Sequence, residues 1–238
     1  MKNLRIFLII VLLGVLSFGS RAQLLDQAKK LIGSSTTGFT EKDASDAIRE
    51  ALVKGTGESV KFVSQVNGYF GNPEIKIPFP ENAREIESKL RSIGLGRKVD
   101  EFIVTMNHAA EEAAKDAEPI FVSAITGMTV NDAIQIVKGK NDAATQYLSK
   151  TTSPALKTKF TPVIKTALDK VDATRMWKDL VDAYNQIPFV KRQNPDLPGY
   201  VTDKAISGLF VMIAKEELKI RQNPVARTTE LLKKVFGG

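Results

Sequence analysis

The chain of 238 residues contains no cysteine and only one histidine. Without cysteine it can form neither a disulfide nor a lipid attachment through an N-terminal thiol. A zinc site needs three or four converging His, Cys or carboxylate ligands, and neither composition nor spacing offers such a set. An EF-hand loop, a G-x-S-x-G motif, a P-loop and a G-x-G-x-x-G motif are all absent. The sequence therefore predicts no metal site and no cofactor, and names no reaction.

The single histidine, His108, lies in a segment with helical spacing between Arg97 and Ala117. A helix there would place His108 opposite Val99 and a row of alanines, beside Glu111 and Glu112. A catalytic or metal-binding role would require a cleft on that side. We favour a solvated surface histidine.

The first residues have the pattern of a secretory signal peptide. Lys2 and Arg5 precede a mostly apolar run over residues 6–18, and Ser20-Arg21-Ala22 offers small residues where a signal peptidase reads. An uncleaved anchor would need about 20 apolar residues, and this run is shorter. We predict a signal peptide over residues 1–22, cleaved between Ala22 and Gln23, and a periplasmic or cell-envelope location. Removing it lowers the formal charge from +7 to about +4, which does not describe a nucleic-acid-binding surface.

The rest of the chain predicts an all-α protein, since no stretch alternates like a β-strand. We expect a short helix and flexible linker over residues 23–38, then one helical domain over residues 39–238 with about nine or ten helices. Two short helices are expected at 130–138, capped by Thr129, and at 142–150. Ser153-Pro154 then predicts a new helix start, and Pro162 a kink or break within it.

The organising element is a predicted helix over residues 200–222. It is apolar nearly all round, which is typical of a helix buried among others. Two proline-rich connectors, residues 67–80 and 187–199, break the helical pattern. The first is too apolar for a solvated loop, so we expect side chains such as Tyr69, Phe70 and Phe79 to insert between helices. A ligand lid is the alternative interpretation.

One carboxylate, Glu216, falls near the middle of the apolar arc of that helix, with Glu217 toward its edge. A buried carboxylate must be paired or protonated. Arg221 and Arg227 are the natural partners, which predicts an ion pair between the central helix and the chain that follows. The functional alternative is a polar anchor at the base of an apolar pocket, or a catalytic carboxylate. Glycosidases need two such groups, and no second inward carboxylate stands out.

Several stretches together resemble an uncharacterised bacterial exported family, catalogued as domain of unknown function 4197. They are Gly68-Tyr69-Phe70-Gly71-Asn72-Pro73 with Ile75-Lys76-Ile77-Pro78, Asn141-Asp142-Ala143-Ala144-Thr145, Ser207-Gly208-Leu209-Phe210, and Ile220-Arg221-Gln222-Asn223-Pro224 with Ala226-Arg227-Thr228-Thr229. The resemblance implies an exported, helical, single-domain protein and carries over no catalytic residue. The family pattern has arginine where this chain has His108, which argues further against a catalytic histidine.

The sequence thus favours a non-enzymatic binding module for a hydrophobic small molecule or an envelope protein. The candidate binding residues are Tyr69, Phe70, Phe79, Glu216, Arg221 and Arg227. Two alternatives stay open: a carboxylate-dependent hydrolase using Glu216, for example on a glycan, and a structural scaffold in an envelope complex.

Overall fold

The structure, a computed structural model, describes residues 41–186, 188–189 and 191–223. The description below concerns the unit that begins at Glu41. The predicted signal peptide, the linker over residues 23–38 and Arg227 lie outside the described residues. The predicted count of nine or ten helices includes parts of the chain outside the described residues, so that count stays a prediction.

Within the described ranges all regular structure is helical and there is no β-strand, so the predicted all-α class is confirmed. Two short irregular helical turns, η1 and η2, flank α4. In chain order the elements are α3 (Glu41–Val63), η1 (Glu81–Ala83), α4 (Arg84–Leu90), η2 (Arg91–Leu95), α5 (Gly96–Ala114), α6 (Ala117–Thr126), α7 (Val130–Lys138), α8 (Ala143–Asp169), α9 (Ala173–Asn185) and α10 (Leu197–Gln222).

Two local features mark the boundaries of helices. Gly94 has φ +84°, a left-handed conformation that glycine adopts without steric cost, and it separates α4 from α5. Thr129 caps α7 through a capping box, in which its side chain accepts from the Asp132 N–H while the Asp132 carboxylate accepts from the Thr129 N–H. The predicted bounds of α7 are confirmed.

The prediction that the chain breaks near Pro154 and Pro162 is wrong, because α8 runs unbroken from Ala143 to Asp169 with both prolines inside. Each proline removes one backbone donor, and both are exposed, on the side where the freed carbonyls can reach water. The opposite side of α8 is buried at every fourth residue, namely Leu148, Thr152, Leu156, Phe160, Ile164 and Leu168. This continuous packing holds the helix together across the prolines.

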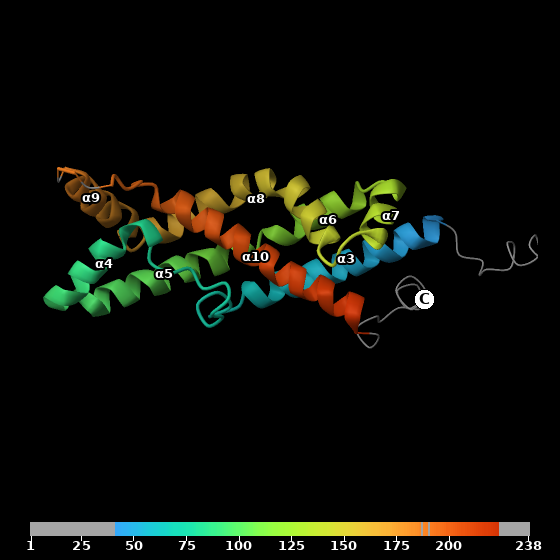
Figure 1. The fold of residues 1–238 in the computed structure, drawn as a ribbon, viewed down its shortest axis with the longest axis horizontal. Helices are drawn as coiled ribbons and strands as arrows, with labels where there is room; N and C mark the ends of the chain where they lie inside the picture. The colour runs from blue at the N-terminus through green and yellow to red at the C-terminus, as the bar shows by residue number, and fades with distance from the viewer. Residues whose placement is uncertain (1–40, 187, 190, 224–238) are drawn as a thin grey trace, which may run out of the picture. The chain divides into compact units, whose positions relative to one another are not determined.

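The interior is built around α8 and α10. α10 crosses α8, α5 and α3 and also contacts α9 (Figure 1), while α8 in turn packs against α5, α6, α7 and α9. Gly208 in α10 allows the connector over residues 67–80 to approach closely, since a Cβ there would lie 2.8 Å from Cε1 of Tyr69. That α10 alone is the centre of the domain stays a prediction.

The first connector inserts side chains as predicted. Tyr69, Ile75, Ile77 and Phe79 are buried, whereas Phe70 is half-buried.

Among the described helices none is by itself long and apolar enough to cross a membrane. Only α6 and α7 taken together reach that length and apolar character among the described helices, and they are bent by 104° relative to each other.

Candidate functional site

The buried carboxylate of α10 is Glu217, and the expectation that it would be Glu216 is wrong. The Glu217 side chain is 7% exposed, whereas the Glu216 side chain is 24% exposed and pairs with Lys219 at 3.3 Å. One residue turns a helix by about 100°. The two carboxylates therefore face different neighbours, and the one that meets α7 and α8 is Glu217.

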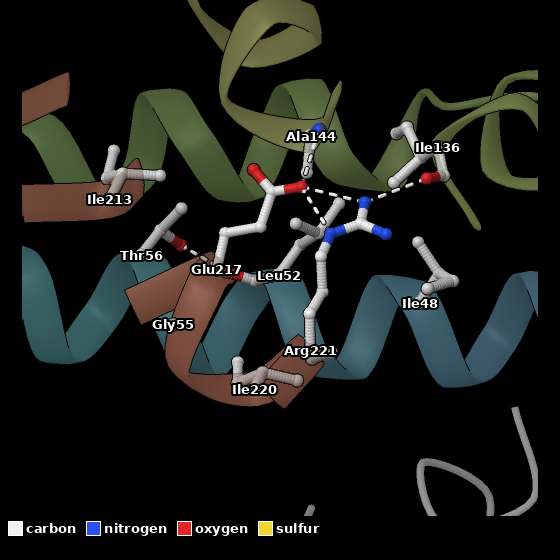
Figure 2. Close-up of a pocket in the computed structure, with 11 residues that line it drawn as sticks. Ile48, Leu52, Gly55, Thr56, Ile136, Ala144, Ile213, Glu217, Ile220 and Arg221 are labelled. Carbon is white, nitrogen blue, oxygen red and sulfur yellow. Dashed lines mark hydrogen bonds and ion pairs between the residues drawn. The ribbon is translucent and has the colours of Figure 1, made fainter. Parts of the chain in front are cut away.

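Glu217 and Arg221 form a polar lock between α10, α7 and α8 (Figure 2). One Glu217 oxygen accepts from the Ala144 N–H at 3.0 Å and from Arg221 at 2.9 Å and 2.8 Å. The other accepts from the Thr145 N–H at 2.9 Å and the Thr145 hydroxyl at 2.8 Å. Arg221 also donates to the Ile136 carbonyl at 2.8 Å.

This lock satisfies backbone groups that helices leave without partners. The first N–H groups of α8 and the last carbonyls of α7 have no partner within their own helices. Glu217 accepts from the former and Arg221 donates to the latter, and both charges are favourably placed in the two helix dipoles. The space beside them is about 30 Å³, which admits about one water molecule. The geometry is that of a structural joint rather than a substrate site.

Glu216 lies in a different place, a surface hollow of about 430 Å³ between α3 and α10. Its charged neighbours there are Lys54, Glu58, Lys215 and Lys219. The predicted pairing of Glu216 with Arg221 is wrong, because the Arg221 guanidinium binds Glu217. The predicted pairing with Arg227 lies outside the described residues.

A second buried carboxylate, Glu111 in α5, holds the connector over residues 67–80. It accepts from the N–H groups of Asn67 at 3.1 Å, Tyr69 at 3.1 Å and Phe70 at 3.2 Å. One turn earlier, Asn107 pairs with both the N–H and the C=O of Ile77, each at 2.8 Å. The connector is thereby fixed to α5 at both ends, which does not describe a mobile lid.

His108 lies on the outer side of this clamp. Its side chain is 47% exposed, with Nε2 3.9 Å from Glu111, and its ring meets Phe70 edge-on with centroids 6.5 Å apart. The surface position predicted for His108 is confirmed. Within the described ranges no group of three or more His, Asp or Glu side chains is arranged to hold a metal ion.

An apolar groove of about 510 Å³ lies between α4, η2, α5 and α9, and we call it the α5–α9 groove. Three aromatic rings form its inner wall. The ring centroid of Phe79 lies 5.5 Å from those of both Phe102 and Trp177, and Phe102 stacks on Trp177 with centroids 6.0 Å apart. The other lining residues are Leu90, Leu95, Lys98, Val99, Glu101, Thr105, Val171, Ala173, Met176 and Leu180.

The mouth of the groove keeps apolar side chains in contact with water. Val171 is 55% exposed and Met176 is 53% exposed, although both line the groove. Deeper in, Trp177 is only 4% exposed. An apolar concavity of several hundred Å³ with few polar groups is the usual form of a small-molecule site.

Only one predicted binding residue, Phe79, lines this groove. Tyr69 is buried elsewhere, where its hydroxyl donates to the Ala205 carbonyl at 2.6 Å. Phe70 lies beside His108 and beneath Lys76, whose Nζ is 4.0 Å from the ring centroid. The prediction missed Trp177, Phe102 and Met176. Trp177 and Leu180 are three residues apart, the spacing of one helix face, which was the available signal.

A family model described as "Protein of unknown function (DUF4197)" matches residues 38–237. The chain belongs to this family. Searches against curated proteins and against solved structures found no significant match. The family match confirms the resemblance drawn from the motifs, and any function has to be argued from the geometry of the chain itself.

Proposed function

We propose that this DUF4197 protein is a non-enzymatic binding module that holds a hydrophobic small molecule in the α5–α9 groove. The observation that carries the proposal is the aromatic wall of Phe79, Phe102 and Trp177 behind a mouth where Val171 and Met176 remain half exposed. Burying apolar surface contributes about 25 cal/mol per Å² removed from water, so a ligand that covers this mouth is favoured.

The polar chemistry of the described residues supports a binding role over a catalytic one. Glu111 and Glu217 are occupied by backbone N–H groups, and Asn107 is occupied by Ile77. Glu216, the carboxylate of the alternative hydrolase, lies among lysines outside the groove. No comparable observation favours a hydrolase or a scaffold.

We further infer that the mature protein works in the periplasm or cell envelope, where a hydrophobic ligand or an envelope protein would meet it. The support is the signal-peptide pattern over residues 1–22. Native mass spectrometry of protein purified from its own cell envelope tests both parts. The expected result is a chain beginning at Gln23 with a retained apolar adduct.

Trp177 makes the groove directly observable, because it is the only tryptophan in the chain. Titration with a neutral apolar dye, N-phenylnaphthylamine, should change Trp177 fluorescence and increase dye emission in a saturable way. Met176→Asp places a charge at the groove mouth and should weaken dye binding at least ten-fold.

The matched control is Leu218→Asp, which changes another exposed apolar side chain that does not line the groove. Leu218→Asp should leave dye affinity unchanged. Unsaturable dye binding, or equal loss in both variants with intact circular dichroism, would refute the proposal.

A further inference from the structure

Several charged residues beside the α5–α9 groove are paired with one another. Arg91 binds Glu87 at 2.9 Å and Asp100 at 2.8 Å, and Arg97 lies 3.6 Å from Glu101. On α9, Arg175 binds Asp172 at 2.7 Å, and Lys178 binds Asp182 at 2.5 Å. Within each of these pairs the positive and negative charges offset each other.

Lys98, an exposed residue that lines the groove from the first turn of α5, is in none of these pairs. Its ammonium group has no ion-pair partner among the described residues, and the only other charged lining residue, Glu101, is beside Arg97. A lysine ammonium has three donors and no acceptor. The rim of the groove therefore carries one uncompensated positive charge next to a large apolar wall.

Two further polar side chains line the groove, Thr105 and Trp177. The Thr105 hydroxyl already donates to the Glu101 carbonyl at 3.0 Å, so it offers a ligand only acceptor lone pairs. The Trp177 indole N–H has no acceptor within the described part of the chain. It is also not one of the fully buried polar atoms that lack a partner, so a ligand can reach it. A ligand that fits the apolar wall, the Lys98 ammonium and the Trp177 N–H needs an acceptor-rich, negative end.

We infer that the α5–α9 groove binds an anionic amphiphile, with its apolar chain on the Phe79–Phe102–Trp177 wall and its carboxylate or phosphate head at Lys98. The inference rests on the proposed function and adds the class of ligand. Charge-assisted hydrogen bonds to carboxylate or phosphate are shorter and stronger than neutral ones. At an exposed site they give a selectivity of a few-fold, while the apolar wall supplies most of the affinity.

The test compares three ligands with the same chain and different heads: dodecanoate, dodecanol and dodecyltrimethylammonium, each below its micelle concentration. Trp177 fluorescence and calorimetry measure their affinities. Dodecanoate should bind about five-fold more tightly than dodecanol, and the ammonium ligand more weakly than both. A further measurement with dodecyl phosphate shows whether the groove prefers a carboxylate head group or binds any anionic head group.

Lys98→Gln should reduce dodecanoate affinity to that of dodecanol and leave dodecanol binding unchanged. Lys150→Gln is the matched control, since Lys150 is an exposed lysine on α8 that does not line the groove. If dodecanoate and dodecanol bind equally in the native protein, or if Lys98→Gln changes both alike, the head-group inference is overturned while the groove stands. If no dodecyl ligand binds, the proposed function fails with it.

Discussion

The polar lock at Glu217 gives the sharpest test of how the helices are joined. Glu217→Gln keeps the size of the side chain but replaces one oxygen with an NH₂ group. Every position open to that group faces donors: the Ala144 N–H and Arg221 on one side, the Thr145 N–H on the other. The substitution therefore breaks accepted hydrogen bonds whichever way the amide turns, and it leaves Arg221 without its counter-charge.

The expected loss follows from burial. The two side chains of the pair are 7% and 10% exposed, so water can replace the missing carboxylate only in part. Removing one partner of a buried ion pair costs about 3–5 kcal/mol. We expect Glu217→Gln to lower the free energy of unfolding by about 3 kcal/mol, at the lower end because a little solvent reaches the pair. The total free energy of unfolding of a protein domain is about 5–15 kcal/mol, so this loss would be a large part of it.

Glu216→Gln is the matched control, one residue away on the same helix and with the same chemical change. Glu216 contacts Lys219 at 3.3 Å at the surface, so we expect a loss of at most about 1 kcal/mol. Urea unfolding followed by Trp177 fluorescence and circular dichroism measures both variants, with the shift in midpoint read at constant slope. Equal losses for the two variants, or a loss below about 1 kcal/mol for Glu217→Gln, would refute the role given to the lock.

The fold was predictable from sequence where the signal is local. Thr129 and Asp132 define the start of α7, and Gly94 the break between α4 and α5, through hydrogen bonds and backbone angles within a few residues. The fold was not predictable where the local cost of a proline inside a helix competes with tertiary packing. Pro154 and Pro162 carry a strong local signal for a break, yet the buried face of α8 outweighs it, and that face is defined only by what packs on it.

The candidate site shows the same division. Helical phase predicted that a carboxylate of α10 would be buried, but the choice between Glu216 and Glu217 depends on where α7 and α8 meet α10. Phe79, Phe102 and Trp177 each fall on an inward face in their own segment. Their convergence into one wall depends on the connector being clamped to α5 by Asn107 and on α9 packing beside it, and neither is written in any single stretch of sequence.

The polar side chains buried in the described part of the chain are mostly bound to backbone groups. Glu111, Glu217 and Asn107 act this way. The half-buried Asn185 repeats the Asn107 arrangement by pairing with the N–H and C=O of Gln193 at 2.7 Å and 2.9 Å. Proline-rich connectors lack regular partners for their backbone, so buried amides and carboxylates supply them. Side chains used in this way are not free for catalysis, which is why the groove, rather than the carboxylates, carries the functional proposal.

Two further predictions test the clamp on residues 67–80. Tyr69→Phe should cost about 1 kcal/mol at neutral pH, because the buried hydroxyl loses its bond to Ala205. Burial, and then the charge of Glu111, raise the pKa of Tyr69 well above its usual 10, so this stability is present below about pH 10 and lost as pH rises above it. Urea unfolding from pH 8 to about 11 should therefore show a shallower alkaline decline in Tyr69→Phe, and parallel curves would contradict the assignment. Glu111→Gln points an amide at the three N–H groups that the carboxylate now binds. Exchange of the Tyr69 and Phe70 amides should speed up about ten-fold or more, since a hydrogen bond to a charged group contributes about 1.5–3 kcal/mol. Glu112→Gln, whose side chain is 58% exposed, should leave both amides as protected as before. Equal exchange in the two variants would mean that the connector is held by its buried side chains and not by Glu111.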